Sequence, residues 1–321
     1  MVFPAIVRIG KPLSSAERQS QQSVGIEHWM YPSVSVIIPV YNGAAEVRRA
    51  IDSALAQINC NVEVIVLNDG SKDATASVLA EYGDRIRTIN QQNCGLSKTR
   101  NNGIAEATGE WVAFLDHDDY WLPDKLSLQL KAAERTGFDA VYTNAGNFGE
   151  VARVAELRSE PKAMAEGDLL EPLLLDNFIV VSSVIIRRTV IQKIGGFDSS
   201  LPSVEDWDLW LKLSARGVSF AAVREPVTMY QWRAGSLSKN YELMRSTRKT
   251  IVNRALKADR ARSLPWSVRR RALANIESCS AWFLAGSSPQ KSIRWYVNSL
   301  WYWPFNVNCW KGIVKGCLGR S

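Results

Sequence analysis

The sequence predicts an α/β fold, with a mostly parallel, Rossmann-like sheet, flanking helices and a helical C-terminal extension. Short β-branched runs alternate with amphipathic segments of helix length between residues 33 and 115, which is typical of parallel sheets covered by helices. Polar clusters (YNG, NDGS and DHDD) follow three of these runs. After about residue 240 the sequence becomes basic, tryptophan-rich and helical in pattern. Ligands of such sheets bind outside the carboxyl ends of the strands, so we expect chemistry at the polar clusters.

Four strands and three helices are expected before residue 116. The first strand, residues 34–38, is a buried β-branched run ended by Pro39. The helix over residues 44–57 places Val47, Ala50 and Ile51 on one face. The remaining strands are expected at 62–67, 85–90 and 111–115, and the remaining helices at 73–82 and 96–107.

The pattern loosens after Asp119. We expect a helix at 123–136, a short strand at 140–143 and a loop over 144–168. A strand at 182–186 precedes a turn at 194–198, an amphipathic helix at 205–215 and a strand at 218–223. Residues 274–305 read as two helices joined by a Gly-Ser-Ser-Pro turn, which somewhat resembles a tetratricopeptide unit. A helical hairpin that packs its tryptophans on the preceding domain is the alternative.

Composition excludes several classes of protein. Hydrophobic residues make up 46% and charged residues 22% of 321 residues, which excludes disorder, collagen and a disulfide scaffold. The five cysteines are scattered without a C-x-x-C pair, and two histidines cannot form a multi-histidine metal site. No secretory signal and no uncharged run of membrane-spanning length is visible. We therefore expect a cytoplasmic location.

An acidic turn, Asp116-His117-Asp118-Asp119, directly follows a predicted strand. Three carboxylates in four residues repel one another unless a cation or hydrogen-bond donors lie among them. Mg²⁺ and Mn²⁺ take oxygen ligands, commonly one or two carboxylates with substrate phosphate oxygens. The position at a strand end favours a metal–phosphate site over a solvated turn that caps the next helix.

Three further residues are candidates on position. Asp69 ends the second strand and can accept hydrogen bonds from a base or ribose, although Asn-Asp-Gly-Ser is also good turn chemistry. Arg100 can bind a phosphate or lie on a helix surface. Asp206 begins a helix, where it is either a cap or a general base, and the helix dipole is expected to lower its pKa.

Five motifs together resemble family 2 glycosyltransferases. They occur in the order and spacing of that family over roughly residues 33–240, and they read VSVIIPVYN, VIVLNDGSKD, GLSKTRNNGI, WVAFLDHDDYW and EDWDLWLKL. The resemblance implies a GT-A fold, a nucleotide-sugar donor carrying UDP and inverting transfer to an acceptor hydroxyl. It divides the chain into an N-terminal arm (1–32), a GT-A catalytic domain (33–240) and a basic helical region (241–321).

The resemblance also implies which residues bind the nucleotide. Pro39 and Tyr41 would line the nucleobase pocket, with Tyr41 against the base. Asp69 would bind the uracil edge, and Arg100 would lie near the base or the phosphates. Asp116 would contact the ribose or nucleotide side.

The resemblance also implies which residues bind the metal ion and which one is the catalytic base. Asp118, with Asp119, would contact Mg²⁺ or Mn²⁺ on the diphosphate, and Asp206 would be the catalytic base. Many non-processive members carry a histidine where this sequence has Arg233, so a protein ligand of the metal is expected to be missing here. A Q-x-x-R-W signature is absent, which favours transfer of a single sugar over polymerisation.

The net charge of +7 is unevenly distributed. Residues 241–321 carry a balance of +12, and residues 1–240 a balance of −5. Such a region suits an anionic membrane surface or nucleic acid, while a solvated helical face is the alternative. The basic and aromatic residues between Trp295 and Lys315 favour peripheral contact with the inner face of the membrane.

Two other functions compete with glycosyl transfer to a lipid-linked or other glycan acceptor. A nucleotidyltransferase can share this type of sheet, but residues 39–43 do not supply the Gly-rich, basic triphosphate loop expected of one. A nucleic-acid-binding protein could use the basic region, yet no recognised nucleic-acid module is present. We therefore expect no nucleic-acid partner.

Overall fold

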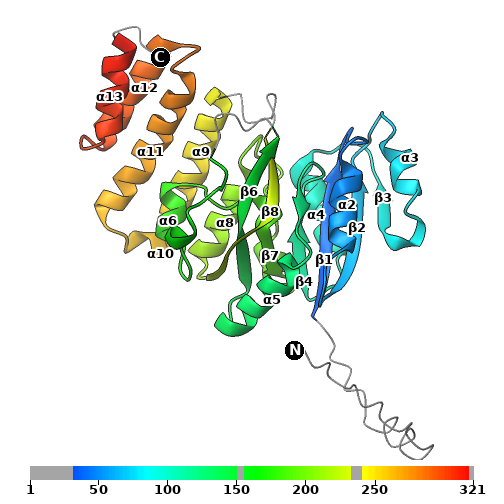
Figure 1. The fold of residues 1–321 in the computed structure, drawn as a ribbon. Helices are drawn as coiled ribbons and strands as arrows, with labels where there is room; N and C mark the ends of the chain where they lie inside the picture. Colours follow the sequence, from blue (N-terminus) through cyan, green and yellow to red (C-terminus); the bar gives the residue numbers. More distant parts are fainter. Residues whose placement is uncertain (1–31, 150–154, 233–240, 318–321) are drawn as a thin grey trace, which may run out of the picture. The chain divides into compact units, whose positions relative to one another are not determined.

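A computed structural model describes residues 32–149, 155–232 and 241–317. The expected N-terminal arm therefore lies outside the described residues, apart from Pro32. The chain from Pro32 onward forms one compact unit. At its centre is an eight-stranded mixed sheet with the strand order β3-β2-β1-β4-β7-β6-β8-β5 (Figure 1).

The first half of the sheet is parallel, as the sequence predicts. Strand β1 (Ser33–Val40) pairs in parallel with β2 (Asn61–Asn68) and β4 (Trp111–Phe114), and β2 pairs in parallel with β3 (Arg87–Asn90). The helices between these strands are α2 (Val47–Leu55), α3 (Thr75–Ala80) and α4 (Leu96–Glu106). Strand β1 continues through Pro39 to Val40, where the sequence reading ended it at Pro39. The loops after β1, β2 and β4 therefore meet at one edge of the sheet.

The second half of the sheet differs from the expectation in two strands. Strand β6 (Ala140–Gly149) extends through the start of the expected loop, and β8 (Phe220–Trp232) runs past residue 223. The two pair in parallel along almost their whole length, with an irregularity between Thr143 and Ala145. The distal half of β6 (NAGNFG) is polar and glycine-rich, and in β8 the polar stretch Arg224-Glu225-Pro226 interrupts the apolar run. This pairing brings the distal end of β8 toward the acidic turn.

The other elements of this half complete the sheet. Strand β7 (Val184–Arg187) is antiparallel to both β4 and β6, and the two-residue β5 (Tyr120–Trp121) is antiparallel to β8. The helices are α5 (Lys125–Thr136), α6 (Leu170–Leu175), α7 (Arg188–Ile194) and α8 (Glu205–Ala215). Helix α7 occupies a segment for which the sequence analysis expected no helix.

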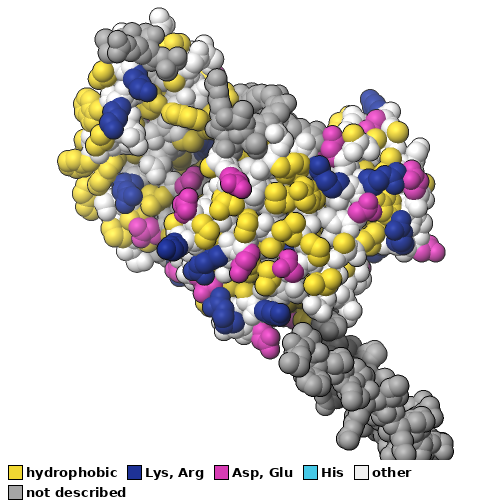
Figure 2. Space-filling view, viewed as in Figure 1, with side chains coloured by type: hydrophobic (Ala, Val, Ile, Leu, Met, Phe, Trp, Pro, Cys, Tyr) yellow, Lys and Arg dark blue, Asp and Glu magenta, His cyan; other side chains and the backbone are white. Residues whose placement is uncertain are grey.

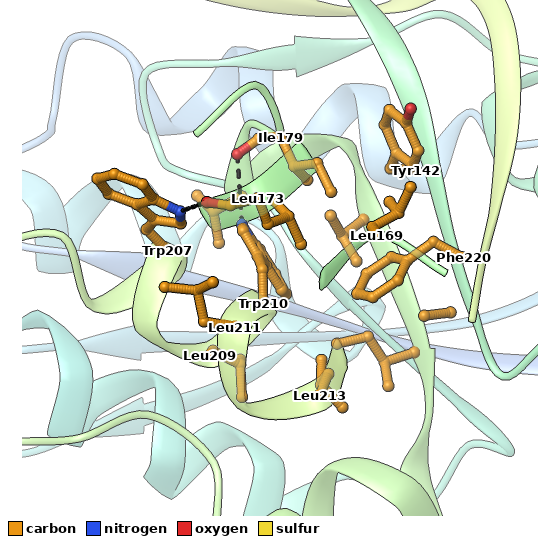
Figure 3. Packing of buried hydrophobic residues seen from close by; sticks show 14 of the residues in the cluster. Tyr142, Leu169, Leu173, Ile179, Trp207, Leu209, Trp210, Leu211, Leu213 and Phe220 are labelled. Atoms are coloured by element: carbon orange, nitrogen blue, oxygen red, sulfur yellow. Dashed lines mark hydrogen bonds between the residues drawn. The ribbon is translucent and has the colours of Figure 1, made fainter. Parts of the chain in front are cut away.

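Two hydrophobic clusters lie on the two faces of the sheet. Ile37 of β1 belongs to a cluster with α4, α6 and α8, whereas its neighbours Val36 and Ile38 belong to a cluster with α2, α3 and α5. This alternation follows from the pleat of the strand. In the first cluster, the indole N–H of Trp207 donates to the Leu173 carbonyl over 2.7 Å, and that of Trp210 donates to the Ile179 carbonyl over 3.3 Å (Figure 3). Helix α8 is therefore fixed by both packing and hydrogen bonds.

The C-terminal region is helical, which confirms the prediction. It contains α9 (Tyr241–Leu256), α10 (Asp259–Arg262), α11 (Trp266–Leu284), α12 (Pro289–Tyr302) and α13 (Val307–Cys317). Helix α9 packs on α8, and α11 packs on α9 and α6. Trp295 and Tyr296 are buried in a small core of the α11–α12–α13 helices. Within the described part of the chain, no helix has the length and apolar character needed to cross a bilayer.

Candidate active site

The loops after β1 and β2 are hydrogen-bonded to each other. Asn42 has a φ of 51°, in the left-handed region that asparagine tolerates. Its backbone N–H donates to Ser71 Oγ over 2.9 Å, and its side-chain oxygen accepts from the Lys72 N–H over 2.8 Å. Tyr41 precedes this turn with 44% of its surface exposed, while Pro39 is buried within β1. Tyr41 is therefore available to a ligand, and Pro39 shapes the strand beneath it.

Asp69 is buried at the end of β2 and is surrounded by donors. Its Oδ1 accepts from Gln91 Nε2 over 2.8 Å and from the Cys94 N–H over 2.9 Å, and its Oδ2 accepts from the Gly95 N–H over 3.1 Å. Burial alone would raise its pKa, but these donors lower the pKa below the usual value. Asp69 thus stays ionised and organises the β3–α4 loop.

Arg100 lies within the protein between two carboxylates. Its side chain is 2% exposed, and it donates to Asp116 Oδ1 over 2.6 Å and to Glu205 Oε1 over 2.7 Å. The guanidinium also lies 5.3 Å from the centroid of the Phe197 ring. Arg100 therefore joins the acidic turn to the start of α8, and its burial makes it a positioning residue in this structure.

Asp119 is the deepest carboxylate of the acidic turn, with 1% of its surface exposed. Its Oδ2 accepts from Ser182 Oγ over 2.5 Å, and its Oδ1 accepts from the Gln231 N–H over 2.9 Å. Burial, followed by the negative charges of Asp116 and Asp118, raises its pKa well above the usual value. Asp119 thus ties the turn to β8. Sequence reasoning identified neither Ser182 nor Gln231, because Ser182 lies just before β7 and Gln231 lies in the unpredicted distal half of β8, both far from Asp119 in the sequence.

Arg49 of α2 is a further residue of this site that sequence reasoning missed. Its Nη2 donates to the Asp118 carbonyl over 2.7 Å and to Gln231 Oε1 over 3.0 Å. The guanidinium carbon lies 5.1 Å from the Tyr120 ring centroid and 4.7 Å from that of Phe148. Periodicity alone places Arg49 and its neighbour Arg48 on the same exposed side of the helix, so no sequence signal separates them.

Asp206 is the second residue of α8. Val204, which precedes the helix, has a φ of 54°, a strained value for a β-branched residue. Asp206 Oδ1 accepts from the Trp207 N–H over 2.7 Å, and Oδ2 accepts from Asn177 Nδ2 over 3.3 Å. Burial, followed by the charge of Glu205, raises the pKa of Asp206 to about 6. The expected lowering by the helix dipole is therefore wrong, because burial and a neighbouring carboxylate outweigh it.

The pKa of Tyr230 in β8 responds to carboxylates of both acidic elements. Burial first, and then the charges of Asp119 and Asp116, raise its pKa, and Asp206 adds to this shift. The Tyr230 hydroxyl is therefore within electrostatic range of both the acidic turn and the start of α8. Arg233, three residues further on, lies outside the described residues. Among the residues that are described, no group of three or more His, Cys, Asp or Glu side chains forms a metal cluster.

The sheet and its flanking helices are arranged as in the GT-A fold. The crystal structure of Staphylococcus aureus TarS 1–349 in complex with UDP has a TM-score of 0.63 and 18% sequence identity to this chain. The similarity covers 90% of this chain and 92% of that one. At this identity the comparison shows the fold, which confirms the GT-A prediction.

Comparison of sequences gives the family. The Glycosyl transferase family 2 signature matches residues 35–195, and the chain belongs to that family. It is 32% identical over 211 residues to an Escherichia coli protein named UDP-Glc:alpha-D-GlcNAc-diphosphoundecaprenol beta-1,3-glucosyltransferase WfaP, covering 64% of this chain and 80% of that protein. An uncharacterized glycosyltransferase of Rickettsia bellii is 39% identical over 194 residues, covering 57% of this chain and 27% of that protein. Among the Rickettsia relatives, the chain spans between 27% and 58% of the protein length.

Proposed function

We propose that this chain transfers one sugar from a UDP-sugar to an acceptor hydroxyl, with inversion at the anomeric carbon. The observation that carries the proposal is Asp206, a carboxylate with a pKa raised to about 6 that directly follows Glu205, the residue that Arg100 joins to Asp116 of the acidic turn. A base works best when its pKa lies close to the working pH. Asp206 accepts the acceptor's hydroxyl proton while that oxygen bonds to the anomeric carbon, and the bond from that carbon to the donor's diphosphate breaks. Nucleoside diphosphate leaves, and a single displacement inverts the centre.

The nucleotide would bind across the β1 and β2 loops. Tyr41 is exposed there and can stack on a base, and the ionised Asp69 keeps the neighbouring loop in place. The family resemblance assigns the uracil edge to Asp69. The TarS structure with UDP supports a uridine nucleotide. Asp116, held by Arg100, would face the ribose side of the donor.

The acidic turn fits a hard divalent cation, Mg²⁺ or Mn²⁺. Such ions need only one or two protein carboxylates when a diphosphate supplies further oxygens. Following the family resemblance, we assign the first contact to Asp118 of the D-x-D pair and a supporting role to Asp119, whose carboxylate is held by Ser182 and Gln231. When bound, the ion neutralises charge that develops on the departing diphosphate. Arg49 holds the backbone of Asp118 in place by donating a hydrogen bond to its carbonyl.

The proposed acceptor is a lipid-linked glycan in polysaccharide biosynthesis, reached from the cytoplasmic face of the membrane. The Escherichia coli relative is named for a diphosphoundecaprenol-linked acceptor. The net charge of +12 over residues 241–321 suits activity at the surface of an anionic membrane.

A donor screen tests the proposal. The purified chain is incubated with a panel of UDP-, GDP- and dTDP-sugars and with Mg²⁺, Mn²⁺ or EDTA, and nucleotide diphosphate release is measured. We expect hydrolysis of a UDP-sugar that needs the cation. In Asp118→Ala this metal-dependent turnover should fall by about 10²-fold or more, whereas Asp124→Ala, at an exposed aspartate beyond the turn, should leave it unchanged. Turnover of no nucleotide sugar contradicts the proposed reaction, and unchanged metal dependence in Asp118→Ala contradicts the metal assignment.

A further inference from the structure

A cluster of aromatic side chains is exposed where the start of α11, the end of α12 and the start of α13 meet. We name it the aromatic end, and it consists of the exposed Trp266, Trp301, Phe305 and Trp310 together with the half-buried Trp303. The exposed fractions are 67% for Trp266, 81% for Trp301, 73% for Phe305 and 54% for Trp310. Figure 2 shows hydrophobic side chains gathered along the edge of the molecule formed by these helices, with basic side chains among them. Large aromatic residues are rarely left this exposed in a group without a partner.

Three rings of the aromatic end are in contact through Trp303. The Trp303 ring centroid lies 6.1 Å from that of Trp266 and 5.4 Å from that of Phe305. The Trp310 indole N–H donates to the Pro304 carbonyl over 2.9 Å, which holds α13 against the same loop. By contrast, Trp295 and Tyr296 on α12 are buried in the core of the three helices. The exposed rings are therefore not part of the hydrophobic core of these three helices.

The charge of these three helices has one sign at the surface. From Trp266 to Cys317 the sequence has seven Lys and Arg residues and one acidic residue, Glu277. Glu277 is fully buried and is paired with Arg245 and Lys249 of α9. Arg271 and Lys311 are exposed, and Lys311 directly follows Trp310. Surface cations beside exposed tryptophans match an interface of anionic headgroups above acyl chains.

We propose that the aromatic end docks on an anionic lipid bilayer, with Trp301 and Phe305 entering the headgroup region and Arg271 and Lys311 facing lipid phosphates. The binding itself does not depend on sugar transfer. It deepens the proposed function in one respect, because it anchors the enzyme to the membrane that holds the proposed lipid-linked acceptor.

Flotation of the full chain with vesicles tests this docking. We expect binding to vesicles of mixed phosphatidylglycerol and phosphatidylcholine, little binding to phosphatidylcholine alone, and weakening by salt. The double variants Trp301→Ala/Phe305→Ala and Arg271→Glu/Lys311→Glu should each lower binding by about tenfold or more. All changed side chains are exposed, so thermal melting should confirm an intact fold.

Trp282→Ala is the matched control. Trp282 is also 67% exposed, but it lies at the other end of α11, about 24 Å from Trp266 at 1.5 Å per residue. This variant should bind vesicles like the parent. Equal losses in Trp282→Ala, or no vesicle binding by the parent, overturn the proposal. A parent that instead sediments as a dimer, and becomes a monomer in Trp301→Ala/Phe305→Ala, assigns the surface to a second copy of the chain. Donor hydrolysis measured without vesicles tests the proposed reaction separately.

Discussion

Two carboxylates at the edge of the sheet, Asp69 after β2 and Asp206 at the start of α8, have pKa values shifted in opposite directions. Both lose solvent, which alone raises a carboxyl pKa. At Asp69 the effect of burial is outweighed by hydrogen bonds from the Gln91 side chain and two backbone N–H groups, so the pKa falls. Asp206 has fewer donors and lies beside Glu205, and its pKa rises to about 6.

The opposite pKa shifts indicate different roles for the two carboxylates. A carboxylate saturated with donors is a fixed anion that shapes a loop, whereas one short of donors exchanges protons near neutral pH. Environments that push the pKa values of two similar groups apart are a common basis for dividing roles in an active site. We therefore expect the same Asp→Asn change to affect transfer at one position and stability at the other.

The largest effect is expected from Asp206→Asn. Sugar transfer should fall by about 10²- to 10⁴-fold, the usual contribution of a general base. The melting temperature should be unchanged or raised at pH 7. Because the pKa of Asp206 is raised in the folded protein, the stability that this group contributes is present below about pH 3.8 and is lost as pH rises through about 6. At pH 7 the buried charge of Asp206 therefore lowers the stability of the folded protein, and the neutral amide of asparagine removes that charge.

The measurement combines transfer rate, UDP affinity and melting temperature on one preparation. Asp208→Asn is not a suitable control, because Asp208 is itself buried and paired with Lys212 and Arg254. The exposed Asp124 provides a better one. Transfer within a few-fold of the parent by Asp206→Asn would leave the residue a structural role at the start of α8, since the asparagine oxygen can also accept from the Trp207 N–H.

The second effect concerns pH. The base must be deprotonated to accept a proton, so kcat/KM for transfer should be constant above about pH 7 and fall below about pH 6, the folded pKa of Asp206. The fall approaches about tenfold per pH unit. The residual activity of Asp206→Asn should lack this acidic limb. A limb that persists unchanged in the variant assigns the titration to another group.

The sequence predicted the parallel half of the sheet and the buried face of α8 because their apolar periodicity is strong. Trp207, Trp210 and Leu211 are all buried, as that periodicity indicates. The sequence did not predict the full length of β8, because Arg224-Glu225-Pro226 interrupts the apolar run, and so the link between Gln231 and Asp119 was hidden. The sign of the Asp206 shift was missed for a related reason. Burial and a neighbouring charge are tertiary properties, whereas the helix dipole is readable from sequence position.

The same substitution at Asp69 gives the third and smaller effect. An amide nitrogen cannot accept the hydrogen bonds that now reach Asp69, so Asp69→Asn should leave a backbone N–H of the Cys94–Gly95 segment unpaired. We expect a destabilisation of about 1–3 kcal/mol and weaker UDP binding. A lowered folded pKa means that the stability from Asp69 is present above about pH 3.8 and lost as pH falls below it. The gap in melting temperature between parent and variant should therefore narrow in acid, and a gap that widens there contradicts the comparison.

The smallest effect tests whether the acidic turn needs support from α2. Arg49 donates to the Asp118 carbonyl and to Gln231, whereas its neighbour Arg48 pairs with Glu81 at an exposed site. Loss of one such hydrogen bond is worth about 0.5–1.5 kcal/mol, or roughly 2- to 13-fold in an equilibrium. Arg49→Ala should raise the Mn²⁺ concentration needed for UDP binding, measured by calorimetry, by an amount in that range. Arg48→Ala, the matched control on the same helix, should leave it unchanged. Equal effects of the two substitutions would mean that general helix stability, and not the position of the Asp118 backbone, governs binding at this edge of the sheet.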